Sequence, residues 1–143
     1  MFPSNAKILI VDDSTFARAS IKTALNQLKY MKVVEAGDVK AAQRQLVKED
    51  QPKDPVTLII TDLGLPEEHG LEFVRWLRAH EKYKNIPVIV ITSSQEKAEI
   101  LEAGRIGVSH YMIKPFEVAT LREKVASTWK KHGEKYLESL KTI

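Results

Sequence analysis

The sequence predicts an α/β fold in which a five-stranded parallel sheet carries helices on both faces. Five short runs rich in Val, Ile and Leu are separated by segments whose apolar residues recur at helical intervals. The runs are nearly continuously apolar, which is typical of parallel strands buried on both faces. Because crossovers between parallel strands are right-handed, few other arrangements of alternating strands and helices remain.

Each predicted strand is a run of β-branched and aliphatic residues bounded by polar or turn-forming residues. In chain order the strands are residues 7–11, 32–36, 58–62, 87–91 and 108–113. The second is the most polar and is therefore expected near an edge of the sheet. The third follows a polar loop at 48–55 and ends at Asp62, just before a turn that contains Gly64 and Pro66.

Five predicted helices alternate with these strands. Apolar residues with a period near 3.6 mark the inner faces of four of them: Ala17, Ile21, Leu25 and Leu28; Val39, Ala42 and Leu46; Leu71, Phe73, Val74 and Leu77; Val118, Leu121, Val125 and Trp129. Asp38 can cap the second helix. Ser93 and Glu96 have the spacing of a capping box, which would start the fourth helix, and that helix would end near Gly104. The fifth is expected from Glu117 to about His132.

Size and charge indicate one domain without a strong electrostatic bias. The chain has 143 residues, of which 43% are hydrophobic, and this is enough for a substantial core. The net charge is only +3, and the basic excess lies wholly in residues 122–143. This is not the profile of a nucleic-acid-binding domain, so we expect no nucleic-acid partner.

Several other classes of protein are excluded by composition. The chain has no cysteine, so it has neither a disulfide framework nor a thiolate metal site. No apolar run approaches the length of a membrane span, and residues 1–6 do not resemble a signal peptide. We therefore expect a cytoplasmic protein.

The last residues are expected to form a separate short element. Beyond Gly133, apolar residues recur at helical spacing between charged ones: Tyr136, Leu137, Leu140 and Ile143. An amphipathic helix docked on its own domain is the first interpretation, and a helix that binds a partner or forms a weak dimer is the alternative. The predicted organisation is a domain at 1–132 and an extension at 133–143, in a monomer or weak dimer.

Four of the predicted strands end in polar side chains. Asp12 and Asp13 follow the first strand, Asp62 the third, Thr92 the fourth and Lys114 the fifth. If these strands are neighbours, their carboxyl ends meet in one pocket at the sheet edge. Clustered carboxylates repel one another by about 1 kcal/mol or more per pair. The cluster therefore predicts a hard divalent cation, Mg²⁺ or alternatively Mn²⁺.

Taken singly, these residues have ordinary structural explanations. Asp13 or Ser14 can cap a helix, Asp62 can close a turn, Thr92 can be a plain strand residue and Lys114 a solvated chain end. Their joint placement at the ends of four strands favours a functional site over coincidence. The histidines lie on polar segments and are expected at the surface, without a metal or catalytic role: His69, His80, His110 and His132.

Four motifs in a fixed order carry a resemblance to a known family. They are Ile8-Leu9-Ile10-Val11-Asp12-Asp13-Ser14; Leu58-Ile59-Ile60-Thr61-Asp62 with Pro66 and Gly70; Val90-Ile91-Thr92-Ser93; and Tyr111-Met112-Ile113-Lys114-Pro115-Phe116. Together they resemble the receiver domain of two-component response regulators, closely the stand-alone CheY-like type, from about residue 6 to 132. The resemblance implies a flavodoxin-like sheet with strand order 2-1-3-4-5.

The resemblance implies the chemistry of the site. Asp62 would be the phosphoacceptor, receiving a phosphoryl group from a sensor histidine kinase or a phosphotransfer protein. Asp12, Asp13 and Asp62, with the backbone carbonyl of Gly64, would hold Mg²⁺. Lys114 would pair with a phosphoryl oxygen.

The resemblance also implies how phosphorylation would be sensed. Thr92 would move toward the phosphoryl group, and Tyr111, the switch aromatic, would turn inward to fill the space. A downstream protein would read the change on the fourth helix, the fifth strand and the fifth helix. The Lys114-Pro115 peptide is implied to be cis.

Three functions remain open from sequence alone. The favoured one is a phosphoryl-accepting signalling protein, not an enzyme, that acts by contact or carries the group in a phosphorelay. The second is a pseudo-receiver that is never phosphorylated, which the intact site residues disfavour. The third is a dehalogenase-type phosphohydrolase, which needs an Asp two residues past the nucleophile, where this chain has Gly64. Family departures at Val39, Glu68 and His69 touch none of the proposed contacts.

Overall fold

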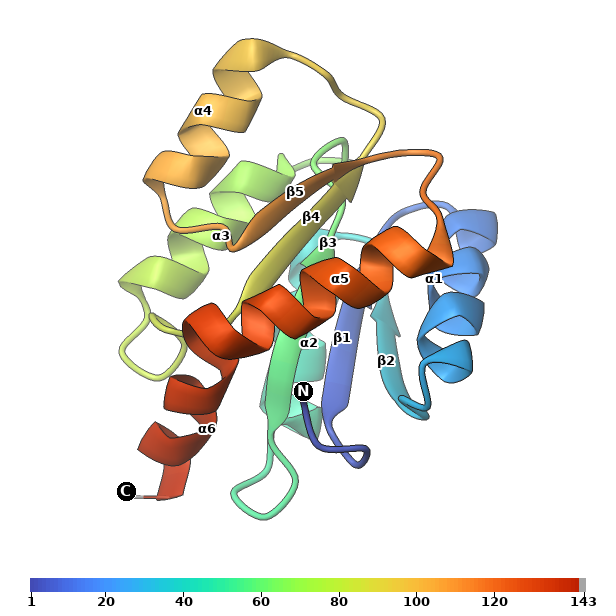
Figure 1. The fold of residues 1–143 in the computed structure, drawn as a ribbon. Coiled ribbons are helices and arrows are strands. Elements are labelled where there is room, and N and C mark those ends of the chain that lie inside the picture. Colours follow the sequence, from blue (N-terminus) through green and yellow to red (C-terminus); the bar gives the residue numbers. More distant parts are fainter. Residues whose placement is uncertain (142–143) are drawn as a thin grey trace.

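The computed structural model describes residues 1–141, which are built around a parallel sheet of five strands. The strands are β1 (Lys7–Val11), β2 (Lys32–Ala36), β3 (Val56–Thr61), β4 (Val88–Thr92) and β5 (His110–Ile113). They lie in the order β2-β1-β3-β4-β5, and every neighbouring pair is parallel (Figure 1). The predicted fold class and strand order are confirmed.

Helices follow each strand within the described residues. They are α1 (Thr15–Gln27), α2 (Val39–Glu49), α3 (Gly70–Ala79), α4 (Lys97–Arg105), α5 (Val118–Thr128) and α6 (Glu134–Lys141). A π-helical turn, Trp129–Gly133, joins α5 to α6. Across residues 1–141, the structure contains no helix that combines the length and the apolar character needed to cross a bilayer.

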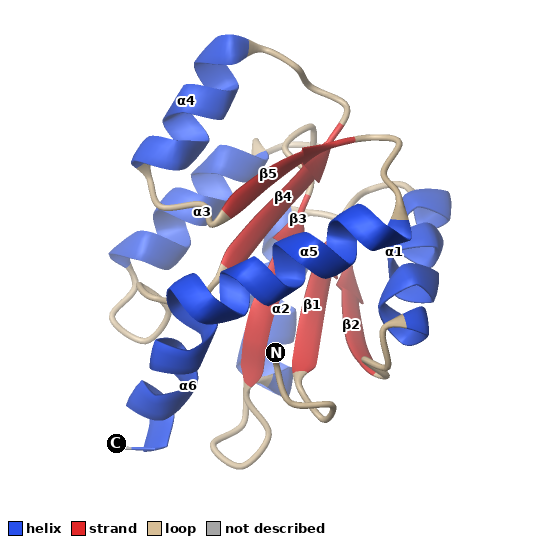
Figure 2. Cartoon of the chain, viewed as in Figure 1, coloured by secondary structure: helices blue, strands red, loops and turns tan. Residues whose placement is uncertain are grey.

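The helices divide between the two faces of the sheet (Figure 2). Alternate residues of a strand point to opposite faces, so β1 sends Ile8 and Ile10 into one core cluster and Leu9 and Val11 into the other. The first cluster lies under α1 and α5, and the second under α2 and α3. This two-sided burial explains why the strand sequences are continuously apolar.

The predicted cap of α2 is present, and of Asp13 and Ser14, either of which could cap α1, Ser14 does so. The cap predicted for α4 is wrong. Ser14 caps α1, accepting from the Ala17 amide at 3.1 Å, and Asp38 caps α2, accepting from the Ala41 amide at 2.7 Å. The capping box of Ser93 and Glu96 does not form, because α4 starts one residue after Glu96, which makes no side-chain cap bond. The hydroxyl that interacts with α4 is instead that of Ser94, which donates to Glu99.

Two loop boundaries also differ from the sequence prediction. Helix α2 continues to Glu49, so the loop predicted from residue 48 begins at Asp50. The Asp50 carboxylate is buried and accepts a hydrogen bond from the Val56 amide at 2.9 Å, which ties the end of α2 to the start of β3. Strand β5 begins at His110, two residues later than predicted, after the turn at Gly107.

The end of the chain packs back on the protein. Gly133 in the π turn lies so close to the rings of Phe2 and Trp129 that a Cβ there would approach them to 2.7 and 2.9 Å. Beyond it, Tyr136 is 4% exposed and Leu140 packs on the cluster under α2 and α3. Helix α6 thus continues from α5 on one face and reaches the core of the other (Figure 1). Ile143, predicted to share this face, lies outside the described residues.

Candidate functional site

The strand order brings the predicted site residues to one edge of the sheet. β1, β3, β4 and β5 are contiguous and parallel, so their carboxyl ends adjoin. Asp12 follows β1, Asp62 follows β3, Thr92 ends β4 and Lys114 follows β5. The condition on which the pocket depended, that these four strands are neighbours, is met.

Three carboxylates cluster at this edge. One oxygen from each of Asp12, Asp13 and Asp62 lies within 4.8 Å of the others. The Asp12 and Asp62 side chains belong to buried residues, whereas Asp13 is exposed. The cluster is therefore buried at Asp12 and Asp62 and accessible to solvent or a ligand at Asp13.

Lys114 bridges the two buried carboxylates. Its ammonium nitrogen lies 2.6 Å from Asp12 Oδ2 and 2.9 Å from Asp62 Oδ2. A cis peptide links Lys114 to Pro115, as the resemblance implied. One ammonium against three carboxylates leaves the cluster with an excess of two negative charges.

Backbone amides hold the other carboxylate oxygens. Asp12 Oδ1 accepts from the Ser14 amide at 2.9 Å, and Asp62 Oδ1 accepts from the amides of Leu63 at 2.6 Å and Gly64 at 3.3 Å. Both carboxylates are thus oriented by the loops that follow their strands. Such bonds stabilise the ionised form of a carboxylate.

Gly70 lets the loop after β3 fold tightly against Asp62. A Cβ at Gly70 would lie 2.2 Å from the Asp62 carbonyl oxygen and 2.7 Å from Leu63 Cα, so only glycine fits. The Gly70 amide also donates to the Leu63 carbonyl at 2.8 Å. The first residue of α3 is therefore in direct contact with the backbone of the proposed acceptor.

Electrostatics keep Asp62 and Lys114 charged. Burial raises the pKa of Asp62, but hydrogen bonds from Thr92 and Lys114, the Lys114 charge and the Leu63 amide outweigh it and hold that pKa below its usual value. Burial lowers the pKa of Lys114, but its bonds to Asp12 and Asp62 outweigh it, and the pKa is raised. At neutral pH Asp62 is a carboxylate and Lys114 an ammonium.

The donor set fits a hard divalent cation. It consists only of oxygens, carries excess negative charge and has an exposed member in Asp13, which leaves room for water ligands. Asp12, Asp13 and Asp62 are the residues that could hold Mg²⁺ or Mn²⁺. Gly64 lies beside them through its amide, and the role of its carbonyl as a ligand stays a prediction.

Thr92 and Tyr111, the predicted switch pair, lie on the adjacent strands β4 and β5. Thr92 is 2% exposed, and its hydroxyl also accepts from the Ser94 amide at 3.4 Å. The Tyr111 hydroxyl donates to the Ser94 carbonyl at 2.9 Å. Both side chains therefore contact the same residue of the loop between β4 and α4.

Two residues near the site, Arg18 and His69, make contacts that the sequence did not predict. Arg18 of α1 donates to the Asp12 carbonyl at 2.6 Å and pairs with Glu35 at 3.1 Å. His69 accepts from the Leu71 amide through Nδ1 and contacts Glu99 through Nε2 at 2.6 Å. No sequence pattern marks these contacts, although His69 stands directly before Gly70, where a helix cap is expected.

Two histidines depart from the surface interpretation. His80 is half-buried, with its ring against those of Trp76 and Tyr83. His110 is half-buried in β5, and its Nε2 is buried without a hydrogen-bond partner in residues 1–141. Burial, then the charges of Lys131, Lys124 and His132, lower its pKa to about 4. It lies at the amino end of β5, away from the carboxylates, and the strand period turns it toward α5.

A family model places the chain among known proteins. The model described as response regulator receiver domain matches residues 8–126. The matched span begins in β1 and ends in α5, and it contains every residue of the carboxylate cluster together with Thr92, Tyr111 and Lys114.

Individual proteins agree with the family model. The chain is 40% identical over 119 residues to a chemotaxis protein CheY homolog of Campylobacter jejuni, covering 83% of this chain and 88% of that protein. It is also 40% identical to chemotaxis protein CheY1 of Helicobacter pylori, covering 83% and 93%. Among solved structures, chemotaxis response regulator CheY4 of Vibrio cholerae superposes with a TM-score of 0.75 at 28% identity, covering 86% and 98%.

Proposed function

The chain belongs to the response regulator receiver family of two-component systems, and from this premise we propose that it accepts a phosphoryl group on Asp62. The donor would be the phosphohistidine of a sensor histidine kinase or of a phosphotransfer protein. The product would be an acyl phosphate that alters the surface seen by a downstream protein. The protein is a signalling module, and its own phosphorylation and dephosphorylation are the only reactions we assign to it.

The arrangement around Lys114 is the observation that supports this proposal most strongly. An ionised carboxylate ends the central strand, and an ammonium lies 2.9 Å from its Oδ2. Lys114 also contacts Asp12 at 2.6 Å, so it would keep one carboxylate partner after Asp62 became an acyl phosphate. The same ammonium is thus placed to follow negative charge from the carboxylate to a phosphoryl oxygen.

The chemical step is a displacement at phosphorus. A carboxylate oxygen of Asp62 attacks the phosphorus, a P–O bond forms, and the P–N bond of the phosphohistidine breaks with its electron pair returning to the imidazole. Lys114 stabilises charge on a phosphoryl oxygen, and the Leu63 and Gly64 amides keep the carboxylate oriented. A divalent cation held by Asp12, Asp13 and Asp62 would neutralise further phosphoryl charge.

The signal would leave the site through Thr92 and Tyr111. If the Thr92 hydroxyl turns to the phosphoryl group, it loses its hydrogen bond from the Ser94 amide. The Tyr111 hydroxyl can then release its hydrogen bond to the Ser94 carbonyl. The loop before α4 would then rearrange, which changes the surface formed by α4, β5 and α5. Curated relatives carry chemotaxis names, so a protein of a chemotaxis system is the first class of target to test.

Intact mass spectrometry tests the chemistry. After incubation with acetyl phosphate and Mg²⁺ we expect a gain of one phosphoryl mass that hydroxylamine removes. Asp62→Asn should abolish the gain, whereas Lys114→Ala should still be phosphorylated but lose the structural response. A phosphoryl group retained by the Asp62→Asn protein would move the acceptor elsewhere. No gain in the wild-type protein would favour the pseudo-receiver, and release of phosphate with turnover would favour the phosphohydrolase.

Amide hydrogen exchange tests the output. With beryllofluoride as a phosphoryl mimic, we expect protection to change between residues 94 and 132, and Tyr111→Ala should reduce that change. If exchange changed only around Asp13 and Asp62, the protein would be a phosphoryl carrier in a relay rather than a contact switch.

A further inference from the structure

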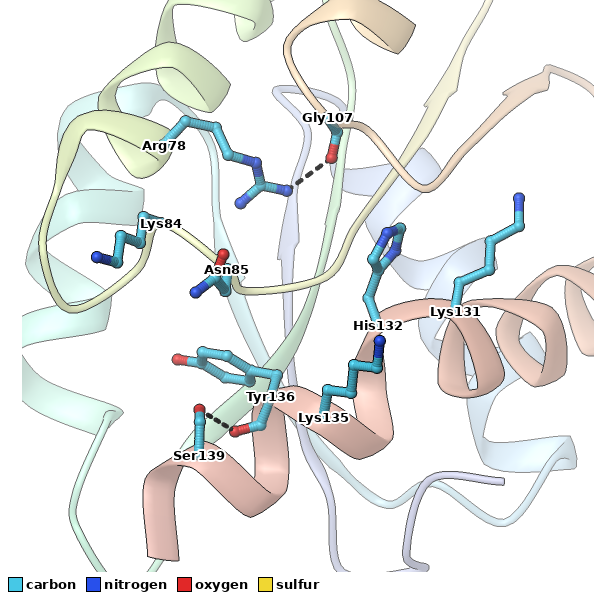
Figure 3. A pocket seen from close by; sticks show the side chains of 9 residues that line it. All are labelled: Arg78, Lys84, Asn85, Gly107, Lys131, His132, Lys135, Tyr136 and Ser139. Carbon is cyan, nitrogen blue, oxygen red and sulfur yellow. Dashed lines mark hydrogen bonds between the residues drawn. The ribbon is translucent and has the colours of Figure 1, made fainter. Parts of the chain in front are cut away.

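One cavity lies far from the carboxylate cluster. It has a volume of about 710 Å³ and lies between the end of α3, the loop to β4, the turn at Gly107, the π turn and α6 (Figure 3). The loop with Lys84 and Asn85 leads into β4 and the turn at Gly107 leads into β5, so the cavity is at the amino edge of the sheet, opposite the proposed site of phosphorylation.

The cavity is lined by positive charge. Its charged lining residues are Arg78, Lys84, Lys131 and Lys135, and none of its lining residues is acidic. Lys84 points away from the others in Figure 3 and pairs with Glu81 at 3.1 Å. Within residues 1–141, the other three cations form no ion pair with Asp or Glu. Three cations thus share a concave surface without a counter-charge.

The cations act on a common point. The Arg78 guanidinium donates to the carbonyls of Gly107 at 2.8 Å and Tyr83 at 3.4 Å, which fixes it in the wall and leaves further N–H groups of its five-donor fork. The pKa of His132 is lowered mainly by burial, and the positive charges of Arg78, Lys131 and Lys135 each lower it further. The three side chains, from two different parts of the chain, therefore raise the potential at one place.

We propose that this cavity binds a small polyanion that carries two or more phosphate groups. Its volume lies within the range of about 300–1,000 Å³ that small-molecule sites occupy. Arginine and lysine together are the usual phosphate ligands, and a concave wall strengthens their field. Three uncompensated cations match the charge of a di- or triphosphate better than that of a single carboxylate. Asn85, which also lines the cavity, adds an amide donor.

Two of the three cations come from the C-terminal segment that holds the basic excess of the chain. Lys131 and Lys135 come from the π turn and α6, beyond the span that the family model matches. These segments close the cavity against α3 and the loop before β4. A ligand there would contact α6 and the turn before β5 together, and it would leave the carboxylate cluster free.

Calorimetric titration tests the proposal. Metal-free protein in EDTA and physiological salt is titrated with tripolyphosphate and, separately, with orthophosphate. We expect saturable binding of one tripolyphosphate, with orthophosphate at least about tenfold weaker because it reaches fewer of the cations. Asp62→Asn should bind equally well, so failure of this site and failure of the acceptor assignment are distinguishable.

A matched set of lysine variants locates the site. Lys131→Ala combined with Lys135→Ala should weaken tripolyphosphate at least about tenfold. Lys130 belongs to the same turn but does not line the cavity, so Lys130→Ala should change the affinity for tripolyphosphate less than about twofold. In NMR spectra, binding should shift the Gly107 amide and the Asn85 side-chain amide and should raise the pKa of His132.

Three results would overturn the proposal. The first is the absence of saturable tripolyphosphate binding. If a poly-glutamate peptide, titrated in parallel, bound and tripolyphosphate did not, the proposal would fail in the same way. The second is equal weakening by Lys130→Ala, which would mean diffuse attraction to a basic surface. The third is binding that leaves the pKa of His132 unchanged, because a phosphate beside three cations must favour a fourth positive charge.

Discussion

Asp13 is the carboxylate of the cluster that faces solvent, and it provides the cleanest test of metal binding. The three carboxylates come together only in the folded protein, so a Mg²⁺ ion held by them should stabilise the protein by mass action, by about 1.4 kcal/mol at tenfold excess over its Kd. This corresponds to a rise in Tm of roughly 3–6 °C for a chain of this size. Asp13→Asn should reduce the shift measured by calorimetry.

A carboxylate outside the cluster serves as the control for this prediction. Glu123→Gln changes an exposed acid on α5 and should leave the Mg²⁺ shift intact. The metal site would be contradicted if millimolar Mg²⁺ did not raise the Tm of the wild-type protein. It would also be contradicted if Asp13→Asn and Glu123→Gln reduced that rise equally.

His110 links stability to pH. Its pKa is about 4 in the folded protein, against an ordinary value of 6.5, so between these values the unfolded chain binds more protons. Stability from this group is therefore complete above pH 6.5 and is lost as the pH falls toward 4. His110→Phe should flatten the pH dependence of urea unfolding over this window. Identical slopes in both proteins would show that the half-buried ring titrates freely.

Gly70 and Gly104 form a contrasting pair of glycines. A Cβ at Gly70 would collide with the backbone of Asp62 and Leu63, so Gly70→Ala should cost about 1–3 kcal/mol, as overpacking usually does. Gly104 is helical, and a Cβ added there would meet nothing within 4 Å, so Gly104→Ala should stabilise by about 0.5–1 kcal/mol. Urea unfolding measures both, and a neutral Gly70→Ala would contradict the close approach.

At the scale of elements, α4 is held at its start by side chains and not by a capping box. Glu99 accepts from the Ser94 hydroxyl and lies 2.6 Å from His69 Nε2, so it joins α4 to the loop before it and to the start of α3. Ser94 in turn carries the contacts of Thr92 and Tyr111. This small network connects the proposed switch residues to the proposed readout surface.

Removing Glu99 should loosen this part of the structure. We expect Glu99→Ala to speed amide exchange in residues 94–100 with a loss of global stability of only about 0–1 kcal/mol, since the contact between His69 and Glu99 is partly exposed. Glu96→Ala is the control, because Glu96 immediately precedes α4 but makes no side-chain cap bond. Equal exchange in the two variants would mean that the network does not hold α4.

At the scale of the whole molecule, α6 joins the two faces of the fold. Tyr136 is buried in the cluster under α2 and α3, although its chain segment continues from α5 on the opposite face. We expect Tyr136→Ala to cost about 3–5 kcal/mol, as large-to-small changes of buried aromatics do. Urea unfolding with tryptophan fluorescence provides the measurement.

The hydroxyl of Tyr136 separates packing from polar effects. It is buried without a hydrogen-bond partner among residues 1–141, so Tyr136→Phe should be neutral or stabilising by up to about 1 kcal/mol. If Tyr136→Ala were as stable as Tyr136→Phe, α6 would not be docked in solution, and residues 133–143 would be available to a partner.

Local chemistry explains which parts of this protein were predictable from sequence. The apolar runs identified the strands because each is buried on both faces. Asp38 identified the start of α2, and the pair Asp13 and Ser14 identified that of α1, because a cap bonds within three residues of itself. Asp12, Asp62, Thr92 and Lys114 could be placed at one edge because parallel strands all end on the same side. These inferences need only short-range geometry and the direction of the strands.

Other features depended on contacts between segments that are distant in the chain. The start of α4 was mispredicted because Ser94 and Glu99, joined to His69, replace the expected cap. The burial of His110, the bond from Arg18 to Asp12, and the meeting of Arg78 with Lys131 and Lys135 leave no local pattern, since their partners lie on other elements. The sequence by itself thus determined the fold class and the residues of the acidic site. Only the tertiary structure decided which side chains surround them and where the unmatched positive charge collects, because packing brings those groups together.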